Sequence, residues 1–405
     1  MTLVILVVAV AVASASTASA ATRTAASCAM SDVQAAVNAA ADGDEVRLPQ
    51  GTCTWSGYVS TGVKRIALVG AGKAATVIVA ASNGQAVFGI AADGASISAM
   101  TLDGGASIGV GSNRDWRIHD IRFRGNAAYT AVYVRGTNAS MHPRGLIDHC
   151  EFLNGRVLVH GYAGVGPTDL RNTNHWSEPL ALGSAEAVYV EANAFTFTVF
   201  YNAIDCEYSG RMVFRYNSVT DSYLESHSIQ GHARACRKWE IYDNTLRQAN
   251  TSVYRPMFLR GGTGVVFGNT FTGNFTAPAI HLDNVRTFTN VGGEVGQCSG
   301  ASVWDGNAES NGYPCRDQIG RGRDAALWSA APYPAQSLEP AYFWDNTING
   351  AVLGVEVVNG SAVHIKSGRD YVANAGAKPG YVPYQYPHPL STPAAPSNLR
   401  LIPGQ

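Results

Sequence analysis

A short central part of the sequence concentrates the ionisable residues that could do chemistry. Two acids, Asp205 and Glu207, come first, and two histidines, His227 and His232, follow them. The residues after these are mostly cationic: Arg234, Arg237, Lys238, Arg255 and Arg260, with Tyr254 among them. Between positions 232 and 261, six Lys or Arg residues stand against two acids, on a chain with a formal net charge of −1. The pattern predicts a local cationic patch.

A cationic patch with acids and histidines beside it suits an anionic polymer. In a uronic-acid polymer, β-elimination begins when a base removes the proton next to the carboxylate. That proton is acidic enough only when the carboxylate charge is neutralised. Arg234 and Arg260 could do this through paired N–H donors, and a Ca²⁺ ion held by Asp205 and Glu207 could do it as well.

The remaining residues of the patch have expected roles in the same reaction. His227 or His232 is a suitable base, since imidazole exchanges protons near neutral pH. We expect the substrate to be bound by Arg237, Lys238, Tyr254 and Arg255. The sequence therefore favours a lyase that cleaves an acidic polysaccharide by β-elimination.

Two other functions remain open on these residues. A glycoside hydrolase needs two carboxylates beside the scissile bond, and Asp205 with Glu207, Asp221 or Glu225 could supply them. A non-catalytic solenoid that binds carbohydrate or mediates adhesion would instead use the charged residues as a surface ladder of ion pairs, which contribute little to stability. A second charged group lies further along the chain: Asp317, Arg321, Arg323 and Asp324.

A recurring pattern shows which elements must position these residues. Asparagine recurs at spacings of 24, 27, 25 and 77 residues, at Asn193, Asn217, Asn244, Asn269 and Asn346. Mostly apolar residues stand five and three positions before each asparagine and two positions after it. This alternation has period two, which is typical of strands. A repeat of this length indicates stacked coils that bury their apolar faces against one another.

The sequence therefore predicts an all-β fold, a right-handed parallel β-helix solenoid. In stacked coils the repeated asparagine side chains could hydrogen-bond to one another in a ladder. The two interruptions of the spacing predict long loop insertions at 161–179 and 292–340. A short helix at 33–40, capped by Asp32, is expected to cover the N-terminal end of the solenoid, and a strand is expected at 45–48.

Segments of the sequence also resemble a known superfamily. The stretch from Gly43 to Thr52 is similar to the first turn of pectate-lyase-like parallel β-helices, and the pairs Tyr216-Asn217, Asp243-Asn244 and Gly268-Asn269 are similar to their coil repeats. The resemblance covers roughly residues 30 to 375. It implies the fold and a likeness to secreted polysaccharide lyases. The superfamily also includes hydrolases, epimerases, esterases and adhesins, and its catalytic motifs do not transfer to this chain.

The ends and the composition complete the expected organisation. Residues 1–20 read as a secretory signal, residues 21–390 as a single β-helix domain, and residues 391–405 as a C-terminal linker. We therefore expect an extracellular or periplasmic protein. The near-neutral charge gives no indication of nucleic acid or membrane as a partner, and we expect a monomer.

Seven cysteines in a secreted chain favour disulfides with one thiol left over. Cys28 with Cys53 could tie down the N-terminal segment. Cys206 with Cys236 could link neighbouring coils, and Cys298 with Cys315 could tie the long insertion. Cys150 occupies an inward repeat position and is expected to be a buried free thiol.

Overall fold

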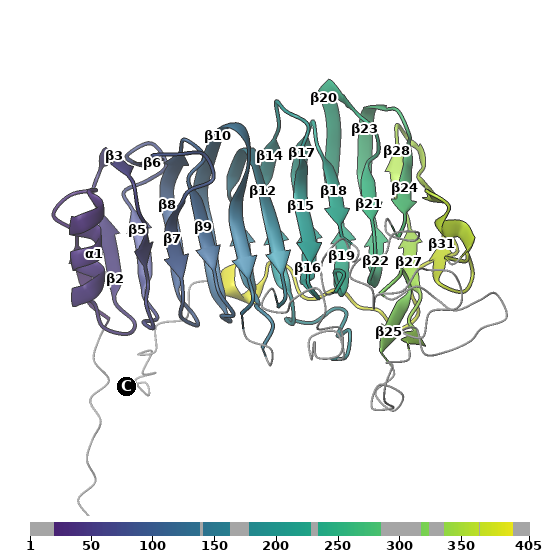
Figure 1. Ribbon diagram of the computed structural model, residues 1–405, viewed down its shortest axis with the longest axis horizontal. Helices are drawn as coiled ribbons and strands as arrows, with labels where there is room; N and C mark the ends of the chain where they lie inside the picture. The colour runs from purple at the N-terminus through teal and green to yellow at the C-terminus, as the bar shows by residue number, and fades with distance from the viewer. Residues whose placement is uncertain are drawn as a thin grey trace, which may run out of the picture.

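The fold is a parallel β-helix in which successive coils pair strand upon strand (Figure 1). The computed structural model describes residues 20–137, 141–162, 178–227, 234–284, 317–323, 336–363 and 365–391. Within them, 29 strands join in one continuous sheet that wraps around the core. The all-β parallel fold predicted from the repeat is confirmed.

The strands stack in three rows. The first row comprises β1 (Thr22–Thr24), β2 (Glu45–Leu48), β5 (Ala67–Gly70), β8 (Ser96–Asp103), β10 (Trp116–Arg135), β11 (Gly145–Asp148), β13 (Val188–Glu191), β16 (Arg211–Arg215), β19 (Lys238–Tyr242), β22 (Thr263–Phe267), β27 (Ala341–Trp344) and β31 (Tyr371–Ala373). The second row comprises β3 (Gly51–Trp55), β6 (Thr76–Ala80), parts of β8 and β10, β12 (Glu151–His160), β14 (Ala194–Thr196), β17 (Ser218–Thr220), β20 (Thr245–Val253), β23 (Thr270–Phe275) and β28 (Thr347–Ile348).

The third row carries the candidate site. It comprises β4 (Val59–Ser60), β7 (Ala86–Ile90), β9 (Ser107–Val110), the ends of β10 and β12, β15 (Asn202–Glu207), β18 (Tyr223–Ser226), β21 (Met257–Leu259), β24 (Ala279–Leu282) and β30 (Gly354–Val357). Three further short strands pair antiparallel: β29 (Ala351–Val352) with β28, and β25 (Arg321–Arg323) with β26 (Gln336–Leu338). Two 3₁₀ turns, Ser361–Val363 and Pro389–Ser391, complete the described elements.

The apolar repeat positions form the core. The residues three positions before the anchors are paired in register from coil to coil, as in Val190 with Phe214 and Phe214 with Ile241. All three are fully buried. In the second row, Phe152 stacks on both Phe123 and Phe195, with ring centroids 4.7 and 4.3 Å apart. One strand could not bury this surface alone, so the coils stabilise each other.

The repeated asparagines form the predicted ladder. The side-chain amide of Asn193 donates to Asn217 Oδ1 at 3.1 Å, Asn217 to Asn244 at 3.1 Å, Asn244 to Asn269 at 2.9 Å and Asn269 to Asn346 at 2.8 Å. Each Oδ1 also accepts the backbone N–H of the preceding asparagine. All five residues are buried, so the ladder satisfies polar groups that water cannot reach.

Helix α1 (Met30–Ala39) covers the N-terminal end of the solenoid, as expected (Figure 1). It begins three residues earlier than predicted, and Asp32 is not its cap. The residue at the cap position is Ala29, which offers no side-chain hydrogen bond, while the Asp32 carboxylate accepts from Ser27 Oγ at 2.6 Å. Asp32 lies in the first turn of the helix, where an acid is still favoured by the helix dipole.

Two of the predicted disulfides are present, Cys28–Cys53 and Cys206–Cys236, and Cys150 is a buried free thiol. The third predicted pair, Cys298 with Cys315, lies outside the described residues. So do most of the two expected insertions, the signal segment up to residue 19, and residues 392–405. Among the helices of the described part, none combines the length and apolarity needed to cross a membrane.

The C-terminal segment runs back along the first row (Figure 1, yellow). The Tyr381 hydroxyl donates to Glu240 at 2.6 Å, and the His388 backbone N–H donates to Glu191 at 2.9 Å. Arg215 donates to the backbone oxygens of Tyr384 and Gln385 at 2.6 and 2.8 Å. These contacts cover the outer face of the first row and leave the third row uncovered by this segment.

Candidate active site

The outer positions of the third row form the candidate site. Ile204 and Cys206 of β15 and Leu224 of β18 point into the core, so the residues between them face outward. Register places Asp205 beside Leu158 and Glu207 beside His160. On the other side, the pairing of Glu225 with Phe258 and of Phe258 with His281 continues the same line. We call these outward positions the third-row face.

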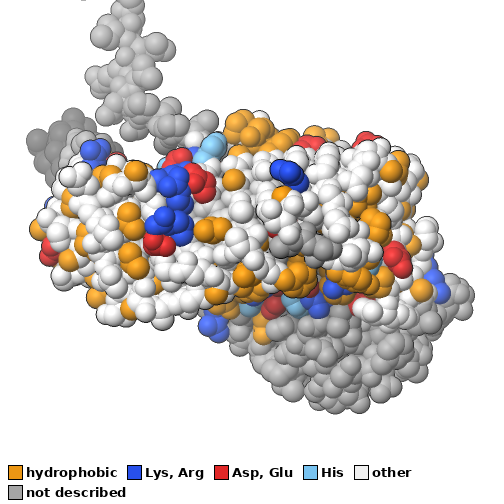
Figure 2. All heavy atoms as spheres, turned by 90° about the horizontal axis from the view of Figure 1, so that it is seen from above, with side chains coloured by type: hydrophobic (Ala, Val, Ile, Leu, Met, Phe, Trp, Pro, Cys, Tyr) orange, Lys and Arg blue, Asp and Glu red, His pale blue; other side chains and the backbone are white. Residues whose placement is uncertain are grey.

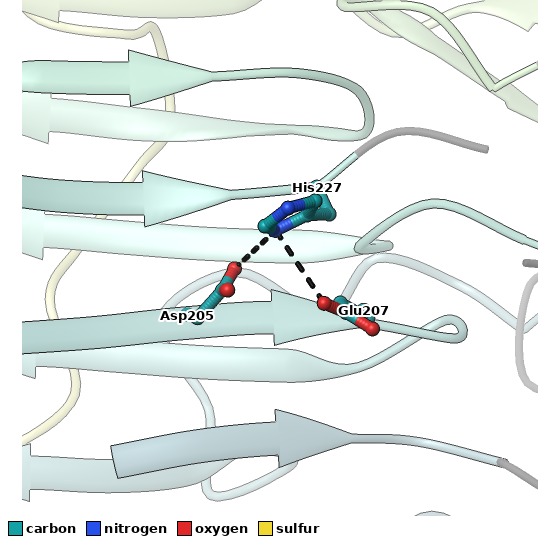
Figure 3. A group of neighbouring side chains, drawn as sticks. All are labelled: Asp205, Glu207 and His227. Carbon is teal, nitrogen blue, oxygen red and sulfur yellow. Dashed lines mark hydrogen bonds and ion pairs between the residues drawn. The ribbon is translucent and has the colours of Figure 1, made fainter. Parts of the chain in front are cut away.

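At its centre, Asp205 orients His227. Asp205 is fully buried, and its Oδ1 lies 2.7 Å from His227 Nδ1 and accepts the Cys206 N–H at 2.8 Å. Its Oδ2 accepts from Arg156 Nη1 at 3.0 Å. Because an ionised carboxylate only accepts, Nδ1 must donate, which leaves the basic lone pair of His227 on Nε2. Figure 3 shows the ring of His227 directed at Asp205 and Glu207.

Glu207 links this pair to a second histidine. Its Oε1 lies 3.5 Å from His227 Nδ1, and its Oε2 lies 3.2 Å from His160 Nε2. His160 Nδ1 lies 3.1 Å from the hydroxyl of Tyr133, and its ring packs 4.8 Å from that of Tyr208. Burial raises the pKa of both tyrosines, and for Tyr208 the neighbouring Glu207 adds to the effect. Both phenols therefore stay protonated at neutral pH.

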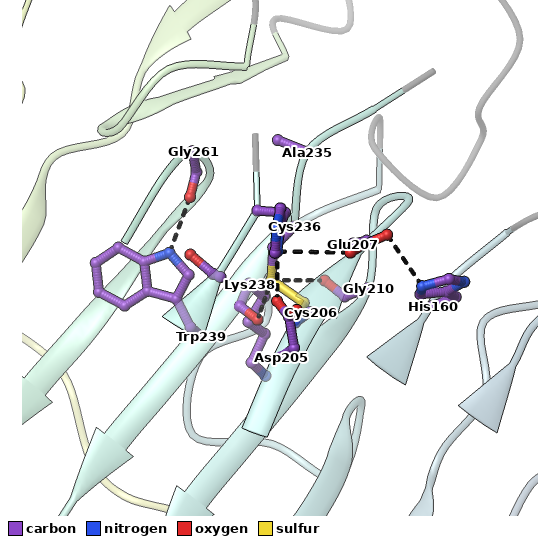
Figure 4. The surroundings of a disulfide bond; sticks show 12 residues. His160, Asp205, Cys206, Glu207, Gly210, Ala235, Cys236, Lys238, Trp239 and Gly261 are labelled. Atoms are coloured by element: carbon purple, nitrogen blue, oxygen red, sulfur yellow. Dashed lines mark hydrogen bonds and ion pairs between the residues drawn. A yellow bond between two sulfur atoms is a disulfide. The ribbon is translucent and has the colours of Figure 1, made fainter. Parts of the chain in front are cut away.

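The disulfide Cys206–Cys236 fixes the two segments that carry these side chains. Cys206 lies between Asp205 and Glu207 in the sequence, and its backbone oxygen accepts the N–H of His227 at 2.9 Å. The Cys236 N–H in turn donates to the backbone oxygen of His227 at 3.0 Å. Figure 4 shows the disulfide beside Asp205 and Glu207. The covalent link holds the acids and His227 together although 22 residues separate Asp205 from His227.

The far side of the third-row face carries arginines of two kinds. Arg260 is buried and forms an ion pair with Glu225. Arg255, by contrast, has no acidic partner among the described residues, and its guanidinium lies over the rings of Phe258 and Tyr254, at 3.6 and 5.0 Å. Such cation–π contacts leave the charge available to a ligand.

Two further residues at the third-row face are exposed to solvent. Arg135, paired in register with His160, is exposed and makes no ion pair within the described residues. Phe200 is 64% exposed, and its ring stacks on Tyr223 with the centroids 5.2 Å apart. Tyr254 is 51% exposed. The face therefore combines uncommitted cations with exposed aromatic rings.

Three of the predicted cations are buried away from this face. Arg234 donates to Asp317 at 2.8 Å, Arg237 to Glu339 at 2.8 Å, and Lys238 lies 2.9 Å from Glu240. All three are at most 1% exposed, and burial lowers the pKa of Lys238. All three form ion pairs within the fold, so they do not belong to an exposed cationic patch as the sequence predicted. His232 lies outside the described residues.

The predicted and observed neighbours of Asp205 and Glu207 differ because of the register in which β15 pairs with β18. In the sequence, Asp205 and His232 each stand 12 positions before an asparagine anchor, and Glu207 and Arg234 each stand 10 positions before one, which would place them side by side in stacked coils. In the structure Ile204 pairs with Leu224, so Asp205 lies beside Glu225 and Glu207 beside His227. The additional residues of this coil follow β18 instead of preceding it. The sequence analysis also missed Arg156, His160, Tyr133 and Arg135, which strand alternation in β10 and β12 could have identified.

The second charged group separates as well. Asp317 pairs with Arg234, and Arg321 donates to Asp370 at 3.0 Å. The side chain of Arg323 and all of Asp324 lie outside the described residues. The aromatic residues near the centre of the chain also lie in different places: Tyr189 is buried under the C-terminal segment, where its ring lies 5.5 Å from that of Tyr384. Phe200, Tyr201 and Tyr208 lie near the third-row face, while Trp176 is outside the described residues.

The donors around Asp205 fit Ca²⁺ poorly. Ca²⁺ prefers six to eight oxygen ligands. The cluster offers the carboxylates of Asp205 and Glu207, which supply fewer oxygens than this, and the neighbouring His160 and His227 present nitrogen. We therefore derive no step of the reaction through Ca²⁺.

Charges elsewhere on the solenoid are largely paired. Arg122 and Lys73 contact Glu151 at 2.7 and 2.9 Å. A shallow hollow of about 560 Å³ lies beside them, lined in part by Lys73, His149 and Tyr216. Figure 2 likewise shows a face on which Lys and Arg gather mainly in one group with Asp and Glu beside them. Paired cations of this kind offer little charge to an anionic ligand.

Comparison with known proteins finds similar chains among solved structures. No protein-family model matches the chain, and no curated protein matches it. Among solved structures, an alginate lyase from Paenibacillus sp. str. FPU-7 aligns over 84% of this chain and 99% of its own, with 10% identity and a TM-score of 0.49. A pectin methylesterase in complex with a hexasaccharide covers 60% of this chain and 93% of its own, at 13% identity and a TM-score of 0.33.

The catalytic domain of a GH87 α-1,3-glucanase covers 91% of this chain and 70% of its own, at 12% identity and a TM-score of 0.33. The neighbours thus include proteins that act on polysaccharides by three different chemistries. At such low identity and TM-score they carry no argument about the site, whose chemistry must come from its own geometry.

Proposed function

We propose that this protein is a secreted polysaccharide lyase that cleaves a uronic-acid-containing polysaccharide by β-elimination at the third-row face. The observation that carries the proposal is the pair of Asp205 and His227, on a face that also carries Arg135 and Arg255, which form no ion pair within the described residues. The buried carboxylate fixes the tautomer of the imidazole, so the basic lone pair is on Nε2. The two described disulfides support an oxidising compartment.

The proposed reaction assigns a role to each group. Arg255, before the strand that follows the His227 coil, pairs with the uronate carboxylate and makes the proton on the adjacent carbon more acidic. Arg135, four coils from Arg255, binds a different carboxylate of the polymer. His227 Nε2 takes this proton, the electrons form a carbon–carbon double bond, and the bond from the sugar ring to the glycosidic oxygen breaks. Tyr208, whose pKa is raised, gives its proton to the departing oxygen. Exposed Phe200 can stack on a sugar ring.

The geometry supports the hydrolase alternative less well. A retaining hydrolase needs one carboxylate free to attack the sugar, but Asp205 is fully buried and accepts three N–H donors. Asp221 accepts the backbone N–H groups of Ala249 and Asn250 and thereby holds a turn. Glu225 pairs with Arg260.

The test is to incubate the purified protein with a panel of uronate-containing and neutral polysaccharides. A lyase forms unsaturated products that absorb ultraviolet light, and we expect this absorbance only with uronate polymers. His227→Ala should reduce the rate by at least about 100-fold, the lower end for loss of a general base. His149→Ala is the matched control, because His149 is exposed and lies outside the third-row face.

Arg255→Ala should lower kcat as well as kcat/KM, because the charge that Arg255 neutralises grows in the transition state. Arg47→Ala, which removes an exposed arginine near the N-terminal end, should leave both constants unchanged. Saturated reducing ends as the only products would identify a hydrolase instead. Tight binding of the polymer without turnover would identify a binding solenoid.

A further inference from the structure

His160 is a buried histidine with an unsatisfied ring nitrogen at the candidate site. Its side chain is 7% exposed, and Nε2 has no hydrogen-bond partner within the described residues. The nearest carboxylate oxygen, Glu207 Oε2, is only 3.2 Å away, yet the two atoms are not aligned for a hydrogen bond. Both atoms can ligate a metal. Two such atoms that lie close together without a hydrogen bond between them are expected where one metal ion binds to both.

The other distances in the cluster agree with such an ion. His227 Nδ1 lies 3.5 Å from Glu207 Oε1 and 2.7 Å from Asp205 Oδ1. Donor atoms of Asp205, Glu207 and His227 all lie within 4.8 Å of one another. Zinc–nitrogen and zinc–oxygen bonds of about 2.0–2.2 Å place neighbouring ligand atoms of a tetrahedral site about 3.3 Å apart. The three residues that meet this distance limit do not include His160, so its side chain must move toward the other donors to coordinate the same ion.

We infer that His160, Asp205, Glu207 and His227 bind one divalent transition-metal ion of the Zn²⁺ type. Two imidazoles with two carboxylates form a donor set that such ions prefer and Ca²⁺ does not. The two carboxylates balance the charge of the dication. The surroundings match those of many metal sites: Tyr133 holds the second nitrogen of His160, and Arg156 holds the outer oxygen of Asp205.

This inference concerns regulation of the site and rests on the proposed function only for its effect on activity. The nitrogen that would bind the metal, His227 Nδ1, is the one that now donates to Asp205. Metal binding replaces that proton, and the remaining proton then sits on Nε2. His227 can no longer act as a base, so the metal-loaded protein should be an inactive lyase.

The test is metal binding in the absence of substrate. Protein without an affinity tag is treated with chelator, dialysed and titrated with ZnCl₂ by calorimetry, and separately with CoCl₂ by visible absorption. We expect one ion per chain, and intense Co²⁺ bands typical of a tetrahedral site. His160→Ala should weaken Zn²⁺ binding at least tenfold, and His149→Ala should not change it. Circular dichroism and the Tm of each variant establish that it is folded.

Glu207→Gln provides a second variant, because it keeps the size of the side chain and removes its charge, and it should weaken binding in the same way. Absence of binding to the unmodified protein, or equal binding by the His160 and His149 variants, would overturn the inference. Activity is read separately: lyase activity that Zn²⁺ does not reduce would refute the regulatory role while leaving a measured binding site in place. If no polymer is cleaved at all, the binding result still stands.

Discussion

The asparagine ladder allows a quantitative prediction for the variant Asn244→Ala. The side chain of Asn244 accepts from the backbone N–H and the amide of Asn217 at 2.9 and 3.1 Å. It donates to the backbone oxygens of Phe214 and Tyr242 at 2.8 and 3.0 Å and to Asn269 at 2.9 Å. Alanine removes all five hydrogen bonds and leaves the buried N–H of Asn217 without an acceptor.

The expected loss follows from these contacts. An orphaned buried donor costs about 1–3 kcal/mol, and each further lost bond contributes about 1 kcal/mol or less, since some acceptors keep other partners. We therefore expect the free energy of unfolding to fall by roughly 4 kcal/mol, which is large for a single substitution. Asn346, at the end of the ladder, makes one asparagine contact instead of two, so Asn346→Ala should cost less.

The assay is urea unfolding followed by tryptophan fluorescence, with the slope of the transition compared between variants. Asn38→Ala is the control, because Asn38 is exposed on α1 and its loss should change stability by less than about 0.5 kcal/mol. The expected order of destabilisation is Asn244, then Asn346, then Asn38. A loss below about 1 kcal/mol for Asn244→Ala would refute the view that the ladder satisfies otherwise buried polar groups.

Two further predictions concern the N-terminal end of the solenoid and the C-terminal segment that packs against the first row. The carboxylate of Asp44 has its pKa lowered to about 2 by backbone N–H donors and by Arg23, so its stabilising effect is complete at neutral pH and is lost as the pH falls from about 4 to about 2. Asp44→Asn should therefore lower the Tm at pH 7 and leave it unchanged at pH 2. Arg215 is fully buried between Glu191 and the C-terminal segment at Tyr384. Arg215→Ala should destabilise the protein by about 3–5 kcal/mol and expose the segment to limited proteolysis.

For each of these two predictions, one experimental outcome would contradict the reasoning. An Asp44→Asn variant whose Tm deficit persists unchanged at pH 2 would mean that the carboxylate charge is not the source of stability. For Arg215, the control is Arg47→Ala, which removes an exposed arginine. Equal protease resistance of the two arginine variants would show that the C-terminal segment is held by its other contacts.

Most of the scaffold could be predicted from the sequence, because the pattern that encodes it is local. Apolar residues at fixed offsets from Asn193, Asn217 and Asn244 determine which side chains point inward, and the ladder follows from stacking them. The pairs Cys28–Cys53 and Cys206–Cys236 were also predictable, since equivalent positions in the fold bring their sulfur atoms together.

The candidate site was harder to predict because burial depends on segments distant in the sequence. Arg237 and Lys238 lie at the start of a first-row strand, where alternation alone suggests exposure. In the structure Lys238 donates to Ala181 at 2.6 Å, while Arg237 reaches Glu339. Conversely, His160 becomes part of the site only through the register of β12 with β15. The spacing of residues in the sequence shows neither the burial of Arg237 and Lys238 nor the register of β12 with β15.

The ladder also shows that the asparagine positions must be kept, while the length of chain between them can vary. The chain uses 25 residues to pass from Asn244 to Asn269 and 77 to pass from Asn269 to Asn346, yet the amides meet at 2.9 and 2.8 Å in both cases. Chain length between rungs is therefore free, provided that each coil returns to its rung. Evolution or a protein engineer can exchange whole loops on the outside of the solenoid without redesigning its interior.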